Sequence, residues 1–179
     1  KKIAKQDSFK ADIDAPEDQT PHDSWARYFA IIHHELQRKP FTEIYQELRN
    51  ASRHLSPFDD YLQLLSFFND RSTDYPAKDI ILAELIAAYT QDQRYNALAS
   101  LFILIFAPLI VNRCKWFLNI NRQNESSDAG NEIFQQLCFE LLDIIKRQES
   151  TKEKLFGVIS GKLKNSFQKV LKIKVEEMG

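Results

Sequence analysis

The residues with the clearest potential for metal chemistry are the neighbouring histidines of His33-His34-Glu35. Histidine and carboxylate side chains are common zinc ligands, and two histidines on one helix can share an ion when they stand four residues apart. Adjacent residues on a helix instead project about 100° apart, so these two histidines do not converge on one ion. His22 and His54 each stand alone in the sequence. We therefore expect no metal site and no cofactor.

The other reactive side chains fit structural roles. Cys114 and Cys138 both stand in apolar surroundings, which favours buried, reduced thiols over a disulfide. Asp59-Asp60 fits the acidic start of a helix. The sequence has no phosphate-binding glycine-rich loop and no nucleophile elbow. We expect that the protein is not an enzyme.

The charged residues are distributed unevenly along the chain. Residues 1–93 carry 11 Lys and Arg against 16 Asp and Glu, a net charge of −5. Residues 94–179 carry 13 against 9, a net charge of +4. Within residues 151–174 there are seven lysines and one acid, Glu153. Such a basic segment indicates a nucleic-acid-binding face, and a solvated helix surface has the same composition.

The spacing of apolar residues predicts helices along most of the chain and no strand of useful length. Residues 1–21 lack this periodicity and are expected to form a flexible lead-in. Seven helices are predicted to begin near residues 24, 42, 57, 76, 96, 128 and 151. The fold class is therefore all-α, a bundle of about seven helices. A change in charge near residues 90–95 divides it into an acidic subdomain, 22–93, and a second subdomain, 94–179; one continuous bundle is the alternative.

Local signals place several of these helix ends. Ser56-Pro57, followed by acidic residues, is typical of a helix start. Ser127 or Asp128 is expected to cap the next-to-last helix, and the segment from Ser150 to Glu153 has the spacing of a capping box. Pro108 should kink the apolar helix, because proline lacks the N–H that bonds to the preceding turn.

The apolar run of residues 101–111 is shorter than the roughly 18 residues of a membrane span, so a buried core helix is expected. Residues 1–20 are polar and acidic and show no signal peptide. Together with the reduced cysteines, these features predict a cytoplasmic protein.

Residues of about 94–174 resemble the second conserved region of bacterial sigma factors. The family pattern begins with an apolar helix in which a proline follows an aromatic residue, and residues 101–110 (LFILIFAPLI) are similar to it. An acidic helix start, a glutamine and alternating large apolar residues come next, matched without a gap by residues 130–142 with Gln135 at the family glutamine. A basic helix with a Lys-Asn pair follows, for which Lys164-Asn165 is the candidate. The N-terminal half resembles no part of the family.

The resemblance implies a partner, the core RNA polymerase, for the helix predicted at 128–148. Its core stripe would be Ile133, Leu137 and Leu141. The matching polar positions, which would contact the clamp helices of the polymerase large subunit, are Asn131, Glu132, Gln135 and Gln136. These residues would otherwise form only the solvated face of the helix.

The resemblance also implies promoter DNA as a partner of the last helix. Leu155, Ile159, Leu163, Phe167 and Val170 recur at helical spacing and should be buried. Residues on the rest of its circumference could follow phosphates with salt-sensitive affinity. The candidates for DNA binding are Lys154, Lys162, Lys164, Asn165, Lys169 and Lys172. Phe156 and Phe167 are the only aromatic residues of this segment.

Two hypotheses about function follow. The first is a sigma-factor-like transcription protein of bacteria that binds RNA polymerase and promoter DNA. The second is a helical protein-interaction or adaptor module with no role on nucleic acid. Its partner would bind the N-terminal helices through Trp25, Tyr28, Phe67 and Phe68, for which core packing is the alternative use. A continuous lysine ridge beside exposed aromatics would favour the first hypothesis, and lysines scattered among acids would favour the second.

Overall fold

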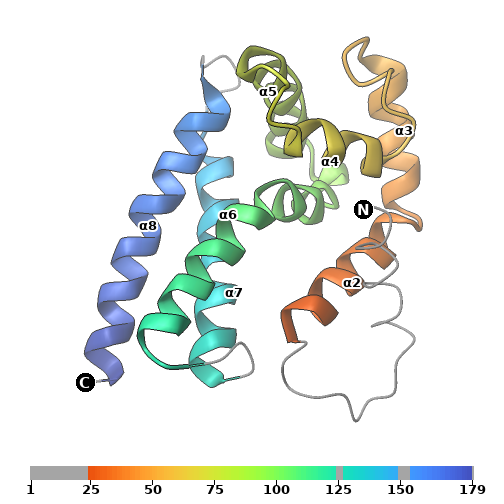
Figure 1. The fold of residues 1–179 in the computed structure, drawn as a ribbon. Helices are drawn as coiled ribbons and strands as arrows, with labels where there is room; N and C mark the ends of the chain where they lie inside the picture. Colours follow the sequence, from red (N-terminus) through yellow and green to blue (C-terminus); the bar gives the residue numbers. More distant parts are fainter. Residues whose placement is uncertain (1–23, 124–126, 149–153, 179) are drawn as a thin grey trace.

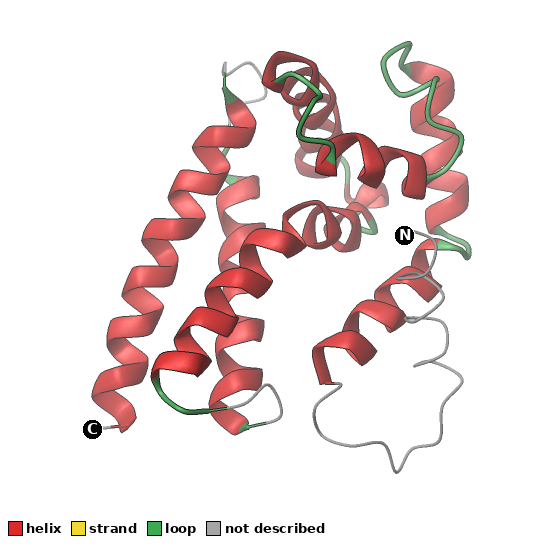
Figure 2. Cartoon of the chain, in the orientation of Figure 1, coloured by secondary structure: helices red, strands yellow, loops and turns green. Residues whose placement is uncertain are grey.

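The protein is represented by a computed structural model that describes residues 24–123, 127–148 and 154–178. Within this part of the chain, all regular structure is helical and no β-strand occurs (Figures 1 and 2). The seven α-helices are α2 (Ser24–Leu36), α3 (Phe41–Ala51), α4 (Tyr61–Asn69), α5 (Tyr75–Gln91), α6 (Leu98–Ile120), α7 (Asp128–Lys146) and α8 (Leu155–Met178), and the short 3₁₀ helix η2 covers Gln93–Tyr95. The prediction of an all-α protein with about seven helices is confirmed. The expected lead-in at 1–21 and the capping box at 150–153 lie outside the described residues.

Side-chain caps explain where two of these helices begin. Ser127 caps α7, because its hydroxyl accepts a hydrogen bond of 2.9 Å from the backbone N–H of Gly130. Asp60 caps α4 in the same way through the backbone N–H of Gln63. The prediction that a helix starts at Ser56-Pro57 was therefore wrong by one turn. Arg49 donates to the Ser56 carbonyl and the Asp59 carboxylate, at 2.7 and 3.1 Å, and so holds this segment as a loop.

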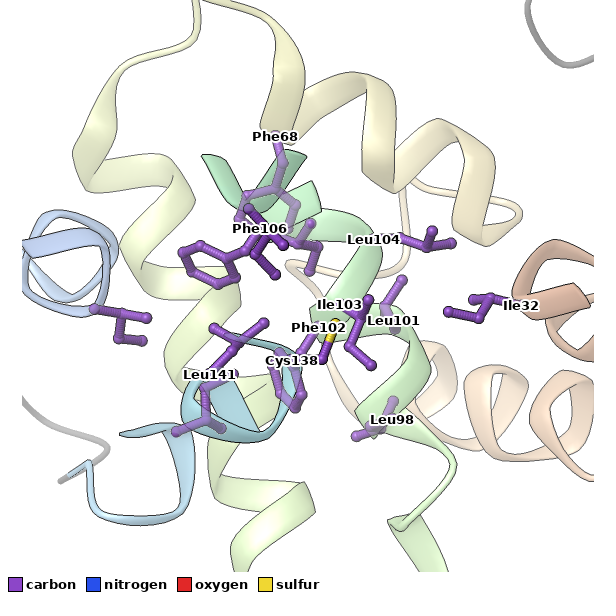
Figure 3. Packing of buried hydrophobic residues seen from close by; sticks show 14 of the residues in the cluster. Ile32, Phe68, Leu98, Leu101, Phe102, Ile103, Leu104, Phe106, Cys138 and Leu141 are labelled. Carbon is purple, nitrogen blue, oxygen red and sulfur yellow. The ribbon is translucent and has the colours of Figure 1, made fainter. Parts of the chain in front are cut away.

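Helix α6 forms the centre of the apolar core. Eleven of its residues are buried, among them Leu101 and Phe102, which are completely inaccessible (Figure 3). Helices α2, α4, α5, α7 and α8 all pack against it. A helix that is apolar on most of its circumference is stable only when neighbours cover it on several sides. The central position of α6 among these five helices therefore follows from its apolar composition.

The proline inside α6 does not end the helix. Residues on both sides of Pro108 are helical, and the Pro108 side chain is exposed. In Figure 1 the first turns of α6 are seen nearly end-on and the later turns run obliquely, so the helix changes direction along its length. This geometry agrees with the predicted kink.

Among the described helices, α6 is long and apolar enough to cross a membrane when length and composition alone are considered. Of its most apolar 18-residue window, 56% is buried inside the protein. Burial of this extent is typical of a core helix, and α6 is therefore compatible with a soluble protein.

Helices α6, α7 and α8 run alternately down and up, as consecutive antiparallel neighbours (Figure 1). The most extensive helix contact is between α7 and α8, followed by that between α6 and α7. The predicted stripe of α7 (Ile133, Leu137, Leu141) is buried, and so are four of the five predicted core positions of α8. Val170, the fifth, is partly buried against the same core.

The apolar core extends across the change in charge near residues 90–95. One cluster of buried side chains runs from Trp25 in α2 to Phe167 in α8. Helix α5, from the acidic half, packs against both α7 and α8. Helix α5 ends at Gln91, and η2 follows it, so the backbone changes direction at the predicted boundary. The two predicted subdomains thus share a core, and their separation stays a prediction from charge.

Candidate binding surfaces

The four residues predicted to bind polymerase lie on the side of α7 that faces away from its buried stripe. Glu132, Gln135 and Gln136 are exposed, and Asn131 is partly buried. The Gln136 amide donates to the carboxylate of Glu140, one turn later, at 3.2 Å. Ser127 sets the start of this helix and thereby fixes the direction in which these side chains project. All four residues are therefore held on one rigid element.

A large aromatic side chain that the sequence reasoning missed stands among these polar residues. Phe139 is 69% exposed, the highest value among the exposed large hydrophobic residues in the described part of the chain. It follows Gln135 by one helical turn, so the two side chains are neighbours. The available signal was its spacing, since Phe139 lies two residues from both Leu137 and Leu141 and must point away from the stripe that they form. An exposed aromatic with polar neighbours is typical of a protein-binding surface.

A groove of about 590 Å³ lies between α7 and α8 beside this surface. Its apolar lining comes from Ile133, Ile144, Val170 and Ile173, and Ile173 is 56% exposed. Its charged lining consists of Glu132, Glu140, Asp143, Arg147, Lys169 and Glu177. Four carboxylates thus face two cations, and Arg147 already forms an ion pair with Asp143 at 3.0 Å. The groove has an excess of negative charge.

The residues predicted to bind DNA do not form one surface. Lys162, Asn165, Lys169 and Lys172 are all exposed, and spacings of three and four place them on one stripe of α8. Lys164 is also exposed, but it projects to the other flank of the helix, where it lines a separate pocket. Lys154 precedes α8 and is exposed, with a left-handed backbone conformation at φ 57°.

At Lys169, the surroundings of the lysine stripe are those expected for the second of the two alternatives set out from the sequence. Lys169 lines the acidic groove together with Glu140 and Asp143. The aromatic residues of α8 are not beside the stripe, since Phe167 is 2% exposed and Phe156 is partly buried against the core. Two further acids of the C-terminal half, Glu149 and Glu153, lie outside the described residues.

The four aromatic residues of the N-terminal half that were considered for an interface take part in core packing instead. Trp25 and Phe68 are each 3% exposed, and Tyr28 and Phe67 are partly buried against the same cluster. The Trp25 ring stacks on Phe134 of α7, with centroids 5.3 Å apart. This contact joins α2 to α7 next to the polar face described above.

No group of three or more His, Cys, Asp or Glu side chains that could hold a metal ion occurs within the described residues. His33 lies beside the Tyr61 hydroxyl, with its Nδ1 at 2.8 Å, and burial lowers the pKa of His33. His54 contacts Glu84 at 2.9 Å.

Both cysteines are buried and neither forms a disulfide, as predicted. Cys114 is completely inaccessible and Cys138 is 6% exposed. Burial raises the pKa of the Cys138 thiol to about 12, because an apolar environment disfavours the thiolate. These thiols have the character of core side chains.

Comparisons with known proteins give no assignment: the chain matches no protein-family model, no curated protein and no solved structure.

Proposed function

We propose that this protein is a sigma-factor-like transcription protein of the bacterial cytoplasm that acts without catalysis by binding core RNA polymerase through the outer face of α7. The observation that carries the proposal is the exposed Phe139 among the short polar side chains of Glu132, Gln135 and Gln136. Protein interfaces commonly combine an aromatic anchor with polar groups at its rim. The order of motifs over residues 94–174 supports polymerase as the partner.

The chemistry of this face suits a helical partner. The amides of Gln135 and Gln136 can donate and accept hydrogen bonds, and Glu132 can pair with a basic side chain. These groups hydrogen-bond a partner without disturbing the buried stripe on the far side of α7. Phe139 would supply apolar burial at the centre of the contact. Truncation of such an anchor commonly weakens binding about tenfold or more.

The test is a binding titration against purified core RNA polymerase. We expect saturable binding that is weakened by Gln135→Ala, by Glu132→Lys and by Phe139→Ala, with the last variant losing about tenfold or more. Gln168→Ala is the matched control, because Gln168 is an exposed amide on α8, outside this face. No binding at micromolar concentrations, or equal loss in the control, would overturn the proposal.

Promoter DNA is the second part of this proposal, with the stripe of Lys162, Asn165, Lys169 and Lys172 as its contact. Exposed lysines at this spacing could follow a phosphate backbone, giving affinity that falls steeply with salt. Lys162→Gln combined with Lys172→Gln should then weaken DNA binding and reduce its salt dependence. Absence of DNA binding at low salt would remove this part and leave the polymerase contact untouched.

A second candidate function is an interaction or adaptor module without a nucleic-acid role. The specific observation in its favour is the position of Lys169 among Glu140, Asp143 and Glu177, whose charge repels phosphates. In that case the acidic groove with its apolar lining would bind a basic amphipathic segment of a protein partner. Saturable binding of a basic amphipathic peptide by a protein that binds neither core polymerase nor DNA would select this candidate.

A further inference from the structure

A second pocket, of about 630 Å³, lies on the opposite flank of α8 from the acidic groove. The end of α4, the start of α5, the middle of α6 and the first half of α8 enclose it. Among the described residues, three cationic side chains, Arg71, Lys78 and Lys164, line it, and no carboxylate does. The pocket is therefore positively charged, in contrast to the groove between α7 and α8.

Lys78 is the most informative residue of this pocket. It is 5% exposed, whereas charged side chains are rarely buried so completely unless they are paired. Its ammonium donates to the Asp70 carbonyl at 3.0 Å and forms no ion pair within the part of the chain that the structure describes. An ammonium has three donors, so this hydrogen bond leaves capacity for an anion.

Aromatic rings form the wall next to these cations. Phe156 is stacked on Phe106 at 5.1 Å and on Phe68 at 6.2 Å between ring centroids. Tyr75, which is 62% exposed, lies at the rim, with its centroid 6.1 Å from that of Phe156. The Lys78 ammonium stands 5.4 Å from the Tyr75 centroid and 5.7 Å from that of Phe156. A planar ligand could stack on this wall close to the cations.

Two of the four glycines of the chain line the same pocket. Gly157 and Gly161 stand one turn apart on α8, and a Cβ at either position would meet nothing within 4 Å. Internal packing therefore does not require glycine here, although glycine weakens a helix interior. The two glycines keep the backbone of α8 bare and the pocket open along one turn.

From the buried Lys78, the aromatic wall and the open glycine turn, we propose that this pocket binds a small phosphate monoester that carries a planar ring, the chemistry of a nucleoside monophosphate. The phosphate lies between Lys78, Arg71 and Lys164, and the ring stacks on the exposed Tyr75 beside Phe156. The phosphate dianion supplies a negative charge that balances the buried ammonium of Lys78. A cavity of 630 Å³ is within the size range of small-ligand pockets.

The test is calorimetric titration of the full chain with AMP and GMP, without polymerase. We expect saturable binding of at least one nucleotide and much weaker binding of adenosine, which lacks the phosphate, and of ribose 5-phosphate, which lacks the ring. Lys164→Met should weaken binding about tenfold, because it removes a charged hydrogen-bond donor. Lys115→Met, which makes the same change of charge at an exposed position of α6 outside the pocket, should leave the affinity unchanged.

Gly161→Leu separates ligand binding from folding. The leucine side chain would enter the pocket, so nucleotide binding should be lost, while the midpoint of thermal unfolding should not fall because leucine favours a helix more than glycine does. The proposal is overturned if neither nucleotide binds at millimolar concentration, or if Lys164→Met and Gly161→Leu bind as the unaltered protein does. Binding of a single-stranded oligonucleotide without binding of AMP or GMP would also overturn it. Failure of polymerase binding has no bearing on these results.

Discussion

The contact that holds α2 against α7 can be tested with one substitution, Phe134→Ala. The Phe134 side chain is 3% exposed and lies among three aromatic rings of α2. Its centroid is 5.3 Å from Trp25, 5.2 Å from Tyr28 and 5.5 Å from Phe29. Removal of the ring would leave a cavity at the junction of the two helices.

The expected loss is about 3–5 kcal/mol in the free energy of unfolding, the usual cost of truncating a buried phenylalanine to alanine. Aromatic pairs add about 0.5–1.5 kcal/mol beyond the buried area, and Phe134 forms three such pairs, so the upper part of this range is expected. A domain of this kind is stable by about 5–15 kcal/mol, so the substitution removes a large share of the total.

Equilibrium urea unfolding, followed by tryptophan fluorescence, measures this loss. The chain has two tryptophans, and Trp25 is buried in the contact itself whereas Trp116 is 52% exposed. Phe139→Ala is the matched control, because it removes the same ring from an exposed position on the same helix. We expect the control to change stability by less than about 0.5 kcal/mol.

A loss below about 1.5 kcal/mol for Phe134→Ala, or a loss equal to that of Phe139→Ala, would refute the packing argument. A double-mutant cycle with Trp25→Leu adds an independent check. The stacked geometry predicts a coupling energy of about 0.5–1.5 kcal/mol between Trp25 and Phe134, and additive effects would contradict direct contact.

Three further predictions concern side chains outside this contact. Burial lowers the pKa of His33 below its usual 6.5, so the unfolded state binds the proton more readily than the folded state does. The free energy of unfolding should therefore be unaffected by His33 above pH 6.5 and should decrease as the pH falls below it. His33→Gln should flatten this dependence in urea titrations. Cys138 and Cys114 should resist alkylation in the native protein and react after unfolding, as followed by mass spectrometry. Asp79→Ala should lower the free energy of unfolding in urea by about 1 kcal/mol, because the Asp79 carboxylate accepts a hydrogen bond of 2.8 Å from the Phe156 N–H at the start of α8. An unchanged midpoint of unfolding would exclude this cap.

The sequence predicted most of the secondary structure because helix formation depends on near neighbours along the chain. Spacings of three and four identified the buried stripe of α7, and the hydroxyl of Ser127 marked the start of that helix. The start of α4 was misplaced because Arg49, which lies on the preceding helix α3, holds Ser56 in a loop through a hydrogen bond. Capping signals and apolar spacing do not indicate that contact.

The candidate sites were predictable only in part. Periodicity placed Gln135 and Gln136 on the outer face of α7, as the structure does. It did not separate Lys164 from Lys169, because both are polar positions on the same helix. The neighbours decide the difference: α7 places carboxylates beside Lys169, whereas α4, α5 and α6 form the pocket beside Lys164.

The sequence by itself determined that this protein is helical, that its thiols are buried and that polar residues cover the outer face of α7, since these properties follow from composition and spacing. Only the tertiary structure decided that Lys78 is buried at 5% exposure while Ile80, two residues later, remains 47% exposed. Hydropathy alone favours the reverse arrangement. The reason is that a residue's burial depends on which distant helices pack over it, and the packing of α4 and α8 around the start of α5 outweighs the preference of the single side chain.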